Sequence, residues 1–192
     1  MSSSEHGRSG GGRVVGGRLM LLAALAGATA LSACTMQPLY APTAAGTSVA
    51  ASLSQVYIDA VEPRLGGEVS DRVAQEVRNK LIFGLNGGAG QPAASAYRMK
   101  LTVSVGESAL GVAPIEAAPA YSITVAATYE VTSVATGKIV TRATSRGTAS
   151  YDRVNQVFAN TRARLDAENR AAGLVADDIR IRLSAAAANG TI

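Results

Sequence analysis

The sequence predicts an α+β domain of two layers, with two helices packed on one face of a mixed four-stranded sheet. Two runs that alternate apolar and polar side chains, 97–105 and 123–131, predict strands with one buried face. Two stretches with apolar residues at helical spacing, one before and one after the strands, predict the helices. The predicted order is strand, helix, three strands, helix, so both helices are available to cover the apolar face of the sheet.

The first 33 residues have the pattern of a cleaved lipoprotein signal peptide. Three arginines precede an apolar run of 13 residues, 19–31, which is shorter than the roughly 20 residues of a membrane-spanning helix. The tetrapeptide Leu31-Ser32-Ala33-Cys34 follows this run and matches a lipobox. We therefore expect residues 1–33 to be removed, which leaves a mature chain of 159 residues and one domain.

Cys34, the only cysteine of the chain, is the predicted lipid attachment site. The alternative is an ordinary small apolar residue at the end of a signal peptide. Lipidation would add a diacylglyceryl group and an N-acyl chain such as palmitate. The two acyl chains of the diacylglyceryl group and the N-acyl chain make three in total. One acyl chain binds a membrane only marginally, so three would hold the protein there permanently. Thr35 follows in place of Asp, and by resemblance to sorted bacterial lipoproteins this favours the outer membrane, with the domain on the periplasmic side.

The composition of the mature chain argues against most enzymes. The single histidine, His6, lies in the signal peptide, and lipidation would consume Cys34, so neither imidazole nor thiol is free. This excludes Ser-His pairs, cysteine nucleophiles and ordinary zinc sites, and we expect no metal and no cofactor. The mature chain has a formal charge of +2, which is not typical of nucleic-acid binding.

A hydrolase that uses two carboxylates remains formally open. The paired acids are Asp177 with Asp178 and Asp166 with Glu168. Neighbouring arginines are interleaved with them, which is typical of ion pairs between residues i and i+4 on a solvated helix face. We therefore predict that the chain is not an enzyme.

Three segments precede the central strands: a tether, a short strand and a helix. Residues 34–53 carry no charge and are rich in Ala, Gly, Ser and Thr, so they predict a flexible tether after the lipid site. A short alternating run beginning at Val56 predicts the first strand. From Gly67, the i, i+4 spacing of apolar residues predicts a helix whose buried stripe is Val69, Val73, Val77 and Leu81.

The segments after the central strands complete the domain. Alternation is weaker over 138–151, where Thr, Ala, Ser and Gly occupy one side, so we expect an edge strand or a bulged one. From Phe158 a long helix is predicted, with the stripe Phe158, Leu165, Ala172, Val175, Ile179 and Leu183. These boundaries predict a single domain over 54–187 and a tail over 188–192.

Three features give the chain a family resemblance. Gln37-Pro38-Leu39-Tyr40 follows soon after Cys34, 151–160 leads into the last helix, and 162–182 is rich in Arg and Ala. With the element order, they make the chain similar to the LPS-assembly lipoprotein family, LptE, in its alphaproteobacterial form. The resemblance implies two helices on a four-stranded sheet, and a non-enzymatic plug for an LptD-type outer-membrane β-barrel. It also implies a part in delivering lipopolysaccharide to the outer leaflet.

Four cations alternate along the polar side of the predicted strands: Arg98, Lys100, Arg142 and Arg146. Under the resemblance, we expect this patch to contact lipid A phosphates or acidic groups of a barrel. The alternative is a solvated sheet face whose charges discourage edge pairing.

The connection 107–120 is long and contains Leu110, Val112 and Ile115. These residues either dock on the partner or the inner leaflet, or fold under the sheet as a satellite of the core.

A second function stays open. The same fold and anchor would suit an adaptor lipoprotein of another envelope machine, in barrel assembly or phospholipid transfer.

Overall fold

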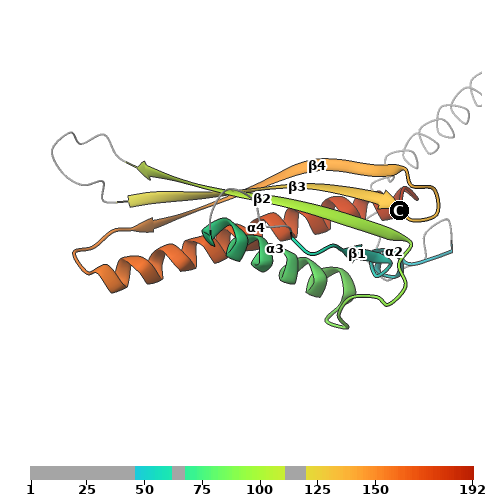
Figure 1. Cartoon of the computed structure of the whole chain (residues 1–192), viewed down its shortest axis with the longest axis horizontal. Helices are drawn as coiled ribbons and strands as arrows, with labels where there is room; N and C mark the ends of the chain where they lie inside the picture. Colours follow the sequence, from blue (N-terminus) through green and yellow to red (C-terminus); the bar gives the residue numbers. More distant parts are fainter. Residues whose placement is uncertain (1–45, 62–67, 111–119) are drawn as a thin grey trace, which may run out of the picture. The chain divides into compact units, whose positions relative to one another are not determined.

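The fold is built around a mixed sheet of four strands in the order β1-β2-β3-β4 (Figure 1). The computed structural model describes residues 46–61, 68–110 and 120–192. β1 runs parallel to β2, and the pairs β2 with β3 and β3 with β4 are antiparallel. The strands are β1 (Val56–Ile58), β2 (Tyr97–Leu110), β3 (Ala120–Ser133) and β4 (Ile139–Asp152). The predicted α+β class, the mixed four-stranded sheet and the order of its strands along the chain are confirmed.

Two long helices, α3 (Glu68–Asn86) and α4 (Val157–Ala188), lie on one face of this sheet (Figure 1). α3 packs on β1 and β2, α4 packs on β3 and β4, and the two helices contact each other. Each half of the sheet therefore has its own helix, and the opposite face has none among the described residues.

The alternation of the strands sorts their side chains between these two faces. Leu101 pairs with Tyr129, and Tyr129 pairs with Ala143, so the three form one row on the covered face. Tyr129 is 2% exposed, and Met99 and Val125 are fully buried. Burying a large apolar side chain contributes about 1.5–3 kcal/mol, so these rows supply much of the core.

The helix stripes are correct in their centres and wrong at their starts. Val73, Val77 and Leu81 of α3 are buried, but Val69 is 36% exposed. In α4 the stripe from Ala172 to Leu183 is buried, whereas Phe158 is 88% exposed. Periodicity identifies the apolar side of a helix but not the point along its length at which it meets the sheet.

β4 is an edge strand, as predicted, and its register with β3 shifts between Val131 and Thr132. Its weak alternation has a steric cause. A Cβ atom on Gly147 would lie 2.5 Å from the carbonyl oxygen of Ala171 in α4. Ser145 is also buried against α4, and its hydroxyl donates to Asp178 Oδ2 at 2.7 Å. The small side chains of β4 therefore allow α4 to approach the strand closely.

The folded domain begins earlier and ends later than predicted. α2 (Val49–Leu53) lies inside the expected tether, and the side chain of Ser48 caps its first turn. Val49 and Leu53 are spaced i, i+4 and are 3% and 2% exposed, so both belong to the core. Ile192, expected in a free tail, is 7% exposed and also belongs to the core. Contacts between segments distant in sequence set both boundaries.

The predicted connection 107–120 is shorter in the structure. Residues from Glu107 to Leu110 continue β2 and pair with β3 from Ile123 back to Ala120. Leu110 is 43% exposed at the end of its strand. Val112 and Ile115 lie outside the described residues, as do Cys34 and the signal peptide.

The close approach at Gly147 yields a stability prediction. Gly147→Ala should lower the free energy of unfolding by about 2 kcal/mol, because its Cβ meets backbone that cannot move aside. Gly106→Ala is the matched control, since its Cβ would have only Thr124 O in reach, at 4.0 Å. Denaturant unfolding of both variants measures the difference. Equal stability of the two variants would contradict the close packing of α4 on β4.

Candidate functional site

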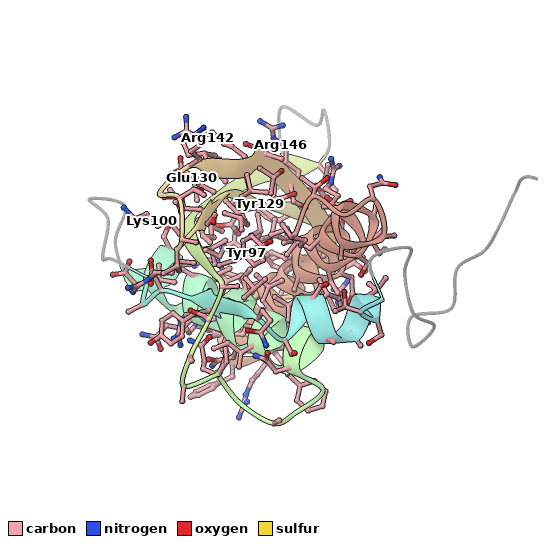
Figure 2. All side chains as sticks on the ribbon, turned by 90° about the vertical axis from the view of Figure 1, so that its right-hand side faces the viewer. Tyr97, Lys100, Tyr129, Glu130, Arg142 and Arg146 are labelled. Carbon is pink, nitrogen blue, oxygen red and sulfur yellow. The ribbon has the colours of Figure 1, made fainter. Side chains whose placement is uncertain are left out.

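The face of the sheet opposite the helices carries rows of polar side chains. Lys100, Glu130 and Arg142 occupy one row across β2, β3 and β4. Thr102, Thr128 and Thr144 occupy the next row, and the last two share a hydrogen bond of 2.9 Å. Figure 2 shows Arg142 and Arg146 projecting from this face, whereas Tyr129 points into the interior. We call this surface the outer face.

Arg98 does not act as a free cation. Its Nε and Nη2 donate to Asp59 Oδ1 at 3.0 and 2.5 Å, and its guanidinium lies 5.4 Å from the ring centre of Tyr57. The hydrogen bond and charge of Asp59 raise the pKa of Arg98 further. Arg98 therefore ties the start of β2 to the segment after β1.

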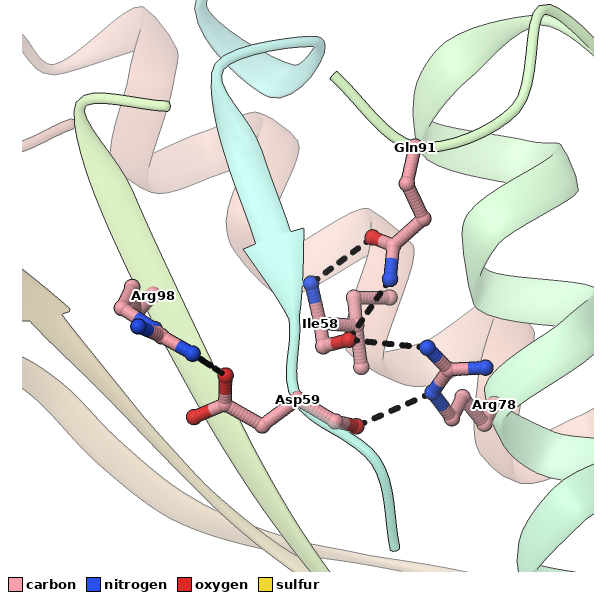
Figure 3. Close-up of polar contacts among 5 residues, drawn as sticks. All are labelled: Ile58, Asp59, Arg78, Gln91 and Arg98. Carbon is pink, nitrogen blue, oxygen red and sulfur yellow. Dashed lines mark hydrogen bonds and ion pairs between the residues drawn. The ribbon is translucent and has the colours of Figure 1, made fainter. Parts of the chain in front are cut away.

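A clasp that the sequence analysis missed closes the other side of β1 (Figure 3). The Gln91 side chain accepts from Ile58 N–H at 2.9 Å and donates to Ile58 C=O at 2.7 Å. Arg78 of α3 donates to the carbonyl oxygens of Ile58 and Asp59 at 3.1 and 2.9 Å. These bonds satisfy backbone groups that a neighbouring strand would otherwise take. No local pattern marks Gln91, because its partner lies 33 residues away.

The other three predicted cations differ in their pairing. Arg142 forms an ion pair with Glu130, which also lies beside Lys100 in the strand register. These residues border a hollow of about 440 Å³ that includes Thr102 and Thr128. Within the part of the chain that the structure describes, Lys100 and Arg146 form no ion pair. Among the described residues, Lys100 and Arg146 are thus the two predicted cations that lie among hydroxyl groups without an ion pair.

The acids considered for hydrolysis are all engaged in ion pairs. Asp166 pairs with Arg170 at 2.7 Å, Asp177 with Arg180 at 3.6 Å, and Asp178 with Arg182 at 2.8 Å. Hydrogen bonds from Ser145 and Arg182 lower the pKa of Asp178. Glu168 is 1% exposed and pairs with Arg72 and Arg164. The predicted i, i+4 pairing on α4 is present for Asp166, Glu168 and Asp178, although Glu168 is buried and not on a solvated face.

A second polar cluster, also missed from the sequence, lies at the end of the sheet where β2 and β3 pair last. Arg164 of α4 joins Glu168 to Glu107, at 3.3 Å from each, and Tyr151 donates to Glu107. Tyr121 and Tyr151 stack with ring centres 5.7 Å apart. Glu107, Tyr121, Tyr151 and Arg164 border a hollow of about 360 Å³. The cluster is assembled from β2, β3, β4 and α4, so no single motif could have predicted it.

The described residues contain no group of His, Cys, Asp and Glu side chains suited to hold a metal ion. None of the helices in residues 46–61, 68–110 and 120–192 is both long and apolar enough to span a membrane.

Comparisons with known proteins give a fold similarity alone. No family model matches the sequence, and no curated protein matches it. Among solved structures, a lipoprotein of Caulobacter crescentus CB15 has a TM-score of 0.55 at 20% identity, over 71% of this chain and 93% of that chain. The minor lipoprotein of Acinetobacter baumannii gives 0.52 at 11% identity, over 69% and 92%. Rare lipoprotein B of Shewanella oneidensis gives 0.51 at 15% identity, over 72% and 98%. The described domain therefore shares its fold with domains of bacterial lipoproteins.

The Glu107–Tyr151 contact yields a pH prediction. Burial, together with the hydrogen bond to Glu107 and its charge, raises the pKa of Tyr151 from 10 to about 12. The folded protein therefore holds this proton more tightly than the unfolded chain, so the contribution is complete below pH 10 and is lost between pH 10 and 12. Tyr151→Phe should flatten the fall of unfolding free energy over this range, measured by denaturant unfolding at several pH values. An unchanged slope would contradict the assignment.

Proposed function

We propose that this chain is a lipid-anchored, non-enzymatic subunit of the outer membrane that is seated in an LptD-type β-barrel and assists lipopolysaccharide assembly. The main support for this proposal is the chemistry of the outer face. It is polar, it has no helix over it among the described residues, and it presents Lys100 and Arg146 without ion pairs there. Such a surface suits a wet lumen and phosphorylated glycolipid.

The end of the sheet at which the described domain begins favours the same role. α2 leads into β1, which pairs with the first residues of β2, whereas Leu110 and Ala120 pair at the far end of the sheet (Figure 1). α2, the first described helix, therefore lies at the end of the sheet opposite the β2–β3 tip. A lipidated Cys34 would leave that tip, with Leu110, free to reach into a partner.

The sequence resemblance to the LptE family and the lipoprotein folds found among solved structures support the proposal from separate directions. The second candidate is an adaptor of another envelope machine, for barrel assembly or phospholipid transfer, and it uses the same anchor and fold.

Co-purification separates the two candidates. The full-length protein would be extracted from membranes in mild detergent and captured by a tag in the exposed turn at 135–137, because Ile192 packs into the core. We expect one LptD-type barrel in near-equal amount. Recovery of the protein alone, or with another machine, would overturn the export proposal.

Charge reversal tests the outer face itself. Lys100→Glu with Arg146→Glu should lower the amount of barrel recovered roughly tenfold, equivalent to about 1.4 kcal/mol of binding free energy. The control variant is Lys138→Glu with Arg162→Glu, which reverses two exposed cations in the hairpin turn and on α4. Equal losses in both variants would show a general charge effect and contradict the assignment to the outer face.

A further inference from the structure

The border of the sheet along β4 has open hydrogen-bonding positions. Tyr97 N–H donates to Gln55 at 3.2 Å and Met99 C=O accepts from Asp59 N–H at 2.9 Å, so the odd residues of β2 bond toward β1. The direction in which the backbone N–H and C=O groups point alternates from one residue to the next along a strand. The even residues of β2 therefore bond to β3, and the odd residues of β3 bond to the odd residues of β4. The N–H and C=O groups of the even residues of β4 consequently point away from β3. Ser150 agrees with the pattern, since its C=O accepts from the Arg170 side chain at 2.8 Å.

The open positions are the backbone groups of Arg142, Thr144, Arg146 and Thr148, which have no hydrogen-bond partner among the described residues. At β1, by contrast, the side chain of Gln91 forms hydrogen bonds with the backbone N–H and C=O groups of Ile58 on the side away from β2. An unprotected edge is a template for another strand, so natural proteins usually block it. Here the described residues leave it open over the middle of a 14-residue strand.

An apolar ledge lies beneath this border. Leu174 and Ile181 of α4 are 53% and 63% exposed. They are seven residues apart and therefore share one side of the helix. The Leu174 Cβ lies 3.0 Å from the position of a Cβ on Gly147, and Asp178, which lies between them in sequence, bonds Ser145. This side of α4 thus flanks β4, where the inward side chains of a fifth strand would rest.

We infer that the β4 border binds an extended strand of a partner protein, with apolar side chains directed to the ledge and acidic side chains on the outer face. The open N–H and C=O groups would pair with the backbone of the added strand, as in strand addition to other sheets. Arg146 has no ion pair among the described residues and lies on the outer face beside the border, so it favours an acidic neighbour.

A second copy of this chain fits the border poorly in the symmetric register centred on Thr144. Antiparallel pairing of two β4 strands about Thr144 would set Arg142 of each copy opposite Arg146 of the other. Like charges directly opposite each other destabilise a strand pair. The inference concerns a protein strand and holds whether or not the partner exports lipopolysaccharide.

Amide hydrogen exchange of the full-length lipidated protein in detergent, followed by NMR, tests this inference. The probe is an end-blocked seven-residue peptide that alternates Val and Glu, and the control peptide alternates Val and Lys. At saturating Val/Glu peptide, exchange at Thr144, Arg146 and Thr148 should slow at least tenfold, while the Val/Lys peptide should leave it unchanged. The inference is overturned by no slowing, by equal slowing with both peptides, or by slowing at Leu101 and Val103 of β2 instead.

Two variants examine the ledge. Leu174→Gln with Ile181→Gln should abolish the slowing, because the inward side chains of the peptide lose their apolar support. Val134→Gln with Phe83→Gln is the matched control, since both residues are exposed, at 55% and 69%, in the turn after β3 and on α3. It should retain the slowing, and loss in both variants would contradict the ledge. Protection that rises with protein concentration without peptide would assign the border to a second copy and overturn the inference.

Discussion

The contact between α4 and the small-residue side of β4 is the constraint on which the rest of the structure depends. Gly147 allows the backbone of α4 to approach the strand, and the hydroxyl of Ser145 anchors Asp178 beside it. With α4 held there, its opposite side meets α3, and the two helices together cover one face of the sheet. The other face is thereby left to polar residues, and the flank of α4 is left beside the open border of β4.

The outer face and the polar cluster around Glu107 and Arg164, at the β2–β3 tip, use charge in different ways. At the tip, Glu107, Arg164, Glu168 and Arg72 neutralise one another, which reduces the cost of partial burial. On the outer face, Arg98 and Arg142 are paired with acids of the same sheet region, but Lys100 and Arg146 are not paired within residues 46–61, 68–110 and 120–192. The paired cations hold strands together. The other two are the ones that an external anion or acidic strand could recognise.

The sequence predicted the parts of the fold that rest on local periodicity. Alternation identified β2 and β3, helical spacing identified α3 and α4, and the weak pattern of 138–151 identified an edge strand. It did not identify α2, the burial of Ile192 or the Gln91 clasp, because each depends on a partner distant in sequence. For the site, alternation placed the four cations on one face. It could not predict that Arg98 forms an ion pair with Asp59, whereas Arg146 forms none among the described residues.

In this fold α4 lies directly against β4, with no side chain between them at Gly147. A nuclear Overhauser spectrum of the protein with labelled methyl groups measures this contact. The Val175 Cγ2 methyl lies 3.1 Å from the position of a Cβ on Gly147, so we expect a strong cross-peak between the Gly147 Hα protons and this methyl group. Absence of that cross-peak in the folded protein, with the β3–β4 cross-peaks present, would show that α4 does not lie against β4 at Gly147.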